Sequence, residues 1–127
     1  MGGVKESLKM FTESLLKDPC VKGGKDFLEN WRPFSKKHVI DFGKEDVFQQ
    51  LRSLQAVSNL FDKEWDPNWG IYLLTHDGPT KRFEVFRTMG GHKRDIKSFS
   101  NLEEALLYKI TLVIDEVGSS LESLKRM

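Results

Sequence analysis

The sequence has few cysteines and no long apolar segment, which are the features that most often indicate a protein's cellular compartment. It has one cysteine, Cys20, in 127 residues, so no intramolecular disulfide can form, and a single thiol suits a reducing compartment. No apolar run approaches membrane-spanning length, and the first residues mix charged with apolar side chains, so no secretory signal is visible. We therefore expect a cytoplasmic protein.

Net charge is also nearly absent. Lysine and arginine number 20 against 19 aspartates and glutamates, which gives a formal charge of +1. The net charge therefore gives no indication that the protein binds nucleic acid or a membrane surface. Hydrophobic residues make up 39% and charged residues 31%, as in ordinary globular proteins. We expect residues 1–127 to form a single domain.

Catalytic and metal-binding motifs are missing as well. His38, His76 and His92 follow no ligand spacing, and Cys20 has no neighbouring cysteine. No serine lies in a nucleophile elbow, and no glycine-rich loop with a following lysine leads into a helix. We expect no metal, no cofactor and no catalytic turnover.

The residues that are present predict a meander of three short strands. Residues 69–76 are rich in β-branched and aromatic side chains, and residues 82–87 alternate polar with apolar side chains as far as Phe86. Residues 77–79 and the pair Gly90–Gly91 supply turns between the strands. Residues 95–99 are short and charged, which is typical of an edge strand.

A capped amphipathic helix is predicted after the meander. Ser100 and Glu103 have the spacing of a capping box, in which each side chain satisfies a backbone N–H of the first turn. Gly118 is predicted to end the helix as a C-cap. The stripe has spacings of three and four residues and consists of Leu102, Leu106, Ile110, Val113 and Val117, with Leu112 and Ile114 widening it.

Helical patterns prevail in the amino-terminal half. A first helix ends by Asp18–Pro19, a short one covers residues 27–31, and a third runs from about Lys44 through Phe61. Residues 39–42 are ambiguous and leave open a fourth strand. The order predicts an α+β domain with N-terminal helices, an antiparallel three-stranded sheet (four-stranded if residues 39–42 join it), and a C-terminal helix packed on the sheet.

Charge is distributed unevenly along the chain. Residues 41–80 carry seven acids and three bases, and residues 81–98 carry six bases and two acids. The acidic part includes two tryptophans, of which we assign Trp69 to the core and leave Trp65 open between a helix cap and an exposed contact. Because tryptophan is a frequent hot-spot residue, we predict a partner-binding site. It consists of Asp62, Glu64, Trp65 and Asp66, with Asp77 at its rim.

The stretch from Trp69 to Val117 resembles the small immunity proteins of bacterial polymorphic toxin and contact-dependent growth inhibition systems. The similarity is carried by the Trp69-Gly70-Ile71-Tyr72 opening and by the segment 97–106, and it covers about the C-terminal half. It implies an antitoxin that neutralises a cognate toxin domain, often a nuclease, by stoichiometric binding. Members that protect against nucleases are often strongly acidic, and this chain is not.

Three strands followed by a helix also resemble DNA-binding domains of the integrase amino-terminal and AP2 types. In those domains the sheet enters the major groove and its bases contact phosphates. Here the bases that would contact DNA are Arg82, Arg87, Lys93, Arg94 and Lys97. Nucleic-acid binding by this basic sheet is therefore the alternative function.

Overall fold

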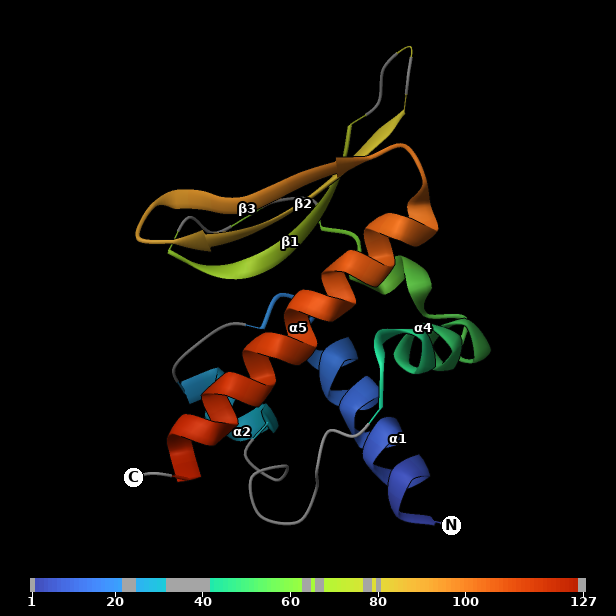
Figure 1. The fold of residues 1–127 in the computed structure, drawn as a ribbon, viewed down its shortest axis with the longest axis vertical. Helices are drawn as coiled ribbons and strands as arrows, with labels where there is room; N and C mark the ends of the chain where they lie inside the picture. Colours follow the sequence, from blue (N-terminus) through green and yellow to red (C-terminus); the bar gives the residue numbers. More distant parts are fainter. Residues whose placement is uncertain are drawn as a thin grey trace.

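The computed structural model describes residues 2–21, 25–31, 42–62, 65, 68–76, 79 and 81–125. It has the predicted α+β architecture, with helices, an antiparallel sheet and a C-terminal helix packed on that sheet (Figure 1). The elements are α1 (Gly2–Lys17), α2 (Lys25–Trp31), α4 (Lys44–Ser53), the 3₁₀ helix η1 (Val57–Leu60), β1 (Trp69–His76), β2 (Arg82–Met89), β3 (His92–Phe99) and α5 (Leu102–Lys125).

The sheet is a meander in the order β1-β2-β3, and both strand pairs are antiparallel. β1 has the predicted bounds, and β2 continues two residues beyond the prediction. β3 begins at His92 instead of residue 95, because Gly90 and Gly91, both at positive φ, form a two-residue turn that pairs His92 with Met89 at once. The charges of residues 92–94 therefore lie on the strand.

α5 lies at the centre of the fold. It crosses one face of the sheet, and its other side packs against α4 (Figure 1). Leu106, Ile110, Val113 and Val117 are buried as the stripe predicts, whereas Leu102 at its start is exposed. Leu112 is also buried, which confirms that a second surface of the helix is covered.

Both ends of α5 differ from the prediction. The helix begins at Leu102, and the side-chain oxygen of Asn101, not Ser100, accepts the backbone N–H of Glu104 at 3.1 Å. Gly118 lies inside the helix, which continues to Lys125. Leu121 extends the apolar stripe by one more turn and is buried. Its burial outweighs the cost of about 1 kcal/mol for an internal glycine.

Of the amino-terminal helices, α4 packs against α5, and α1 packs against α4 and α2. α1 and α2 lie where the sequence predicts them, but the third helix stops at Ser53. Gln55 takes a positive φ, and the chain then forms η1, so Phe61 is in extended backbone and not on a helix. This break buries Ala56 and Leu60. The ambiguous segment 39–41 lies outside the described residues, and Phe42 is buried against Phe11.

Candidate partner-binding site

Asp62 faces the inside of the protein. Its side chain is 10% exposed and accepts the ammonium of Lys109 at 2.9 Å and the backbone N–H of Leu73 at 2.8 Å. The thiol of Cys20 donates to its other oxygen at 3.0 Å. This corrects the prediction that Asp62 presents its charge to a partner, because its carboxylate already has three internal donors.

These contacts close the outer edge of β1. The backbone carbonyl of Cys20 accepts the N–H of Ile71 at 2.8 Å. The backbone N–H of Asp62 donates to the carbonyl of Leu73, and the carboxylate of Asp62 accepts the N–H of Leu73. Lys109 is fully buried and also donates to the carbonyl of Leu60 at 3.0 Å. β1 is therefore capped along its edge by segments from two other parts of the chain.

The thiol of Cys20 is unreactive in this position. Burial above all, and then the negative charge of Asp62 and its hydrogen bond, raise the pKa of Cys20 to about 12, although Lys109 acts in the opposite direction. A thiol with so high a pKa is protonated at neutral pH and is a poor nucleophile. Cys20 is therefore a structural residue of the β1 edge.

Trp65 packs on the sheet face opposite α5. Its ring meets the buried ring of Phe86 edge-on, with centroids 5.5 Å apart, and Phe86 in turn contacts Tyr72 at 5.8 Å. The ring of Tyr72 lies over Gly70, where any side chain would collide with it. Trp65 is thus not the cap of a helix. It is the outermost member of a small aromatic cluster, and 37% of it is exposed.

A β-bulge supplies the charge beside this cluster. Val85 pairs with Lys97 but Arg87 pairs with Arg94, so β3 carries an extra residue at this point, and Asp95 there takes a positive φ. The extra residue moves the alternation of β3 by one position. Lys93 therefore faces outward, whereas Arg94 lines a hollow on the α5 side.

Lys93 is held over the aromatic cluster. Its ammonium lies 4.5 Å from the ring centroid of Phe86 and 5.1 Å from that of Trp65, and it pairs with Glu84 at 3.1 Å. Cation–π contacts and an ion pair together restrain the lysine and the indole. Trp65 is therefore presented to solvent in a restrained position.

The other predicted acids, Glu64, Asp66 and Asp77, lie outside the described residues. Trp69 begins β1 as predicted but is only half-buried, which corrects its assignment to the core. It lines a hollow of about 130 Å³ at the hairpin end of the sheet.

The bases of residues 81–98 are divided between the two faces of the sheet. Arg87 pairs with Glu116 of α5, and the ammonium of Lys97 lies 4.9 Å from the ring centroid of Tyr108 on the same helix. Lys93 is on the opposite face, against Trp65. These bases are thus not all on one face, and Arg87 and Lys97 lie on the face that α5 covers.

Within the part of the chain that the structure describes, no three histidine, cysteine, aspartate or glutamate side chains gather as a metal site would require. No described helix combines the length and apolar character needed to cross a bilayer.

The contacts of Lys109 and Cys20 with Asp62 were not predicted from the sequence. Lys109 did leave a signal, because it is three residues from Leu106 and four from Val113, and so falls inside the apolar stripe. A lone cation on a buried face requires a buried anion. Its partner, however, is 47 residues away.

Comparison of the chain with protein-family models, with curated proteins and with solved structures gives no match.

Proposed function

We propose that this chain is a protein-binding domain of the antitoxin kind, which neutralises one cognate toxin domain by stoichiometric binding and without catalytic turnover. The resemblance of residues 69–117 to immunity proteins suggests the class. One geometric observation supports it further: Trp65 is more than a third exposed, yet it is restrained by Phe86 and Lys93.

A restrained aromatic is a favourable binding anchor for a physical reason. Binding energy is reduced by the cost of immobilising side chains, and a side chain already held in place loses little. Tryptophan also buries a large area and is enriched among hot spots. We therefore place the centre of the interface at Trp65. Glu64 and Asp66 flank it in sequence, and Asp77 keeps its proposed place at the rim.

Trp65→Ala tests this proposal against a toxin domain encoded by a neighbouring gene. Wild type should restore growth of cells that express the toxin and should bind it in equal proportion. The substitution should speed dissociation by about 30-fold, which corresponds to about 2 kcal/mol, with little change in association.

Trp65→Phe is the matched control, because it retains an aromatic ring against Phe86, and its dissociation should lie between the other two. Urea unfolding of each variant must show an intact fold. A dissociation rate unchanged by Trp65→Ala would remove this residue from the interface. Failure of the wild type to bind or neutralise the toxin would overturn the function itself.

Nucleic-acid binding is the alternative, and the distribution of bases speaks against it. A sheet that enters a groove needs its cations on one face, whereas Arg87 and Lys93 lie on opposite faces and both have acidic partners. Titration with duplex DNA at low salt separates the two functions. Salt-sensitive binding that disappears when Arg87, Lys93 and Arg94 are neutralised would favour DNA and refute the antitoxin proposal.

A further inference from the structure

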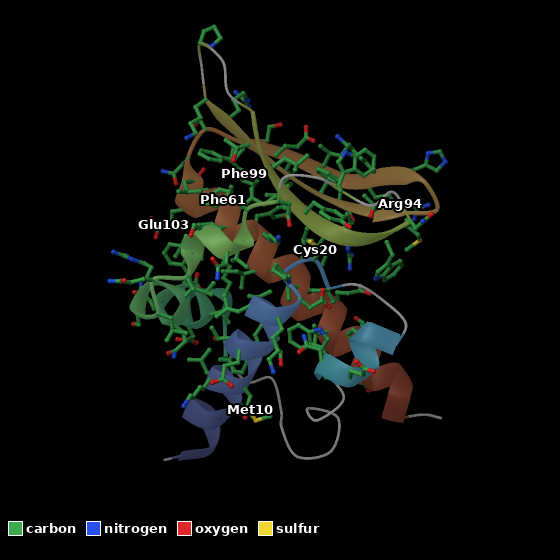
Figure 2. The ribbon with its side chains drawn as sticks, turned by 180° about the vertical axis from the view of Figure 1, so that it is seen from behind. Met10, Cys20, Phe61, Arg94, Phe99 and Glu103 are labelled. Atoms are coloured by element: carbon green, nitrogen blue, oxygen red, sulfur yellow. The ribbon has the colours of Figure 1, made fainter. Side chains whose placement is uncertain are left out.

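A hollow of about 130 Å³ lies at the hairpin end of the sheet, on the side that faces α5. Trp69 of β1, Arg87 of β2, Arg94 and Asp95 of β3, and Glu116 of α5 contribute to its walls. Figure 2 shows Arg94 at this end of the sheet, far from Phe61 and Phe99 at the other end.

The charges in the hollow are not equivalent. Arg87 and Glu116 are both mostly buried and form an ion pair. Arg94 is exposed, and no described residue forms a hydrogen bond or ion pair with it. One guanidinium is therefore available to a ligand, whereas the other is already paired.

Asp95 does not cancel the charge of Arg94 by pairing with it. The main chain at Asp95 turns at the bulge, and its carbonyl accepts the hydroxyl of Tyr108 at 3.2 Å. The electrostatic influence of its carboxylate also reaches Tyr108, since burial and then the charge of Asp95 raise the pKa of that tyrosine.

Size and chemistry then limit what the hollow can hold. The hollow of about 130 Å³ has room for a group of a few heavy atoms. A guanidinium offers a planar pair of N–H donors that matches a carboxylate. The indole of Trp69 supplies an apolar wall for the methylene groups that would carry such a carboxylate.

We infer that this hollow is a binding site for a carboxylate group of the protein partner, received by Arg94 between Trp69 and the Arg87–Glu116 pair. The carboxylate comes from an acidic side chain or from the partner's chain terminus. The inference rests on the proposed function for the identity of its partner. It adds a basic contact on the α5 side of β3 to the aromatic contact at Trp65 on the opposite face, so one partner would have to reach both faces around the exposed edge strand β3.

The experiment is an NMR titration of the ¹⁵N-labelled full chain with three probes, each up to millimolar concentration. The first is an amidated pentapeptide with one central glutamate, the second is the same peptide with glutamine there and a free carboxyl terminus, and the third is inorganic phosphate. Resonances of Arg94, Trp69 and the β2–β3 hairpin should shift in a saturable way with at least one peptide. The peptide that acts identifies the source of the carboxylate.

Arg94→Glu should weaken that peptide about tenfold or more, and Arg94→Lys should give an intermediate loss, because it retains the charge but not the planar fork. Arg52→Glu on α4 is the matched control and should change nothing, since α4 lies away from the hairpin end (Figure 1). Shifts with phosphate alone would overturn the carboxylate assignment. No saturable shift with any probe, or equal losses in Arg94→Glu and Arg52→Glu, would overturn the site.

The failure of this inference is distinguishable from that of the proposed function. If wild type and Arg94→Glu bind the toxin equally, the carboxylate site is wrong and the antitoxin role remains. If wild type binds no toxin but the peptide titration succeeds, the role is wrong and the site remains.

Discussion

The two edge strands of the sheet, β1 and β3, differ in how their outer sides are protected. Along β1, the N–H groups of Ile71 and Leu73 are bound by Cys20 and Asp62, and a fully buried lysine completes the arrangement. Along β3, most side chains are exposed, and a bulge interrupts the pairing with β2. One edge is thus closed by the chain itself, while the other is protected from unwanted pairing by charge and a bulge.

The β1 edge therefore contributes mainly to the stability of the fold, whereas the β3 edge is available to a binding partner. Closing β1 requires a buried ion pair, which is expensive to desolvate and costly to break. β3 contributes fewer buried side chains, so substitutions there should cost little stability and should act on partner binding. A residue of the closed, buried part should therefore respond more strongly to substitution than a matched residue on β3.

Lys109→Met should have the largest effect. The substitution leaves Asp62 mostly buried without its cation, and losing one member of a buried pair costs about 3–5 kcal/mol. Lys97→Met on β3 removes the same type of group from an exposed position and should change stability by no more than about 0.5 kcal/mol. Urea unfolding of both variants gives the measurement. Equal losses would show that the closed edge does not depend on its ion pair.

Ile110→Ala should rank next. Ile110 is fully buried between α5 and the rest of the core, so its truncation should cost about 2–5 kcal/mol. Ile96→Ala makes the same change on β3, where the side chain is 51% exposed, and should cost well under 1 kcal/mol. Unfolding in urea again distinguishes them. A negligible effect at Ile110 would refute the assignment of the apolar stripe.

The smallest effect concerns pH at the β1 edge. Cys20 has a pKa of about 12 in the fold and 9.0 in an unfolded chain, so the unfolded state releases the proton first as pH rises. The contribution of the thiol to stability is therefore constant below about pH 9 and falls as pH rises from 9 toward 12. By pH 10 the wild type should lose about 1 kcal/mol more than Cys20→Ala, measured relative to pH 8. Parallel pH profiles of the two proteins would exclude the thiol as the cause.

The strands and helices were predicted well where the evidence was local. β-Branched and aromatic composition located β1, period-two alternation and the glycine turns located β2, and the apolar stripe located α5. At the two ends of α5, the errors occurred where two local signals competed. Asn101 displaced Ser100 as the cap, and the burial of Leu121 carried α5 past Gly118.

The candidate site was predicted less well, because its residues are defined by distant partners. Asp62 was assigned to the surface as one of a run of acids, but Lys109 and Cys20 draw it inside from 47 and 42 residues away. Trp65 was left open for the same reason. Its support, Phe86 and Lys93, comes from strands that lie beside it only in the folded chain.

By itself the sequence determined the α+β class, the meander and the buried face of α5, because alternation, turn residues and helical spacing act over a few neighbouring residues. Only the tertiary structure decided which charges are internal and which remain available. A carboxylate or guanidinium has the same local sequence signal whether it is buried and paired or exposed. What separates Asp62 from Arg94 is the packing of α5 and the bulge in β3, which set the distance from each charge to its nearest partner.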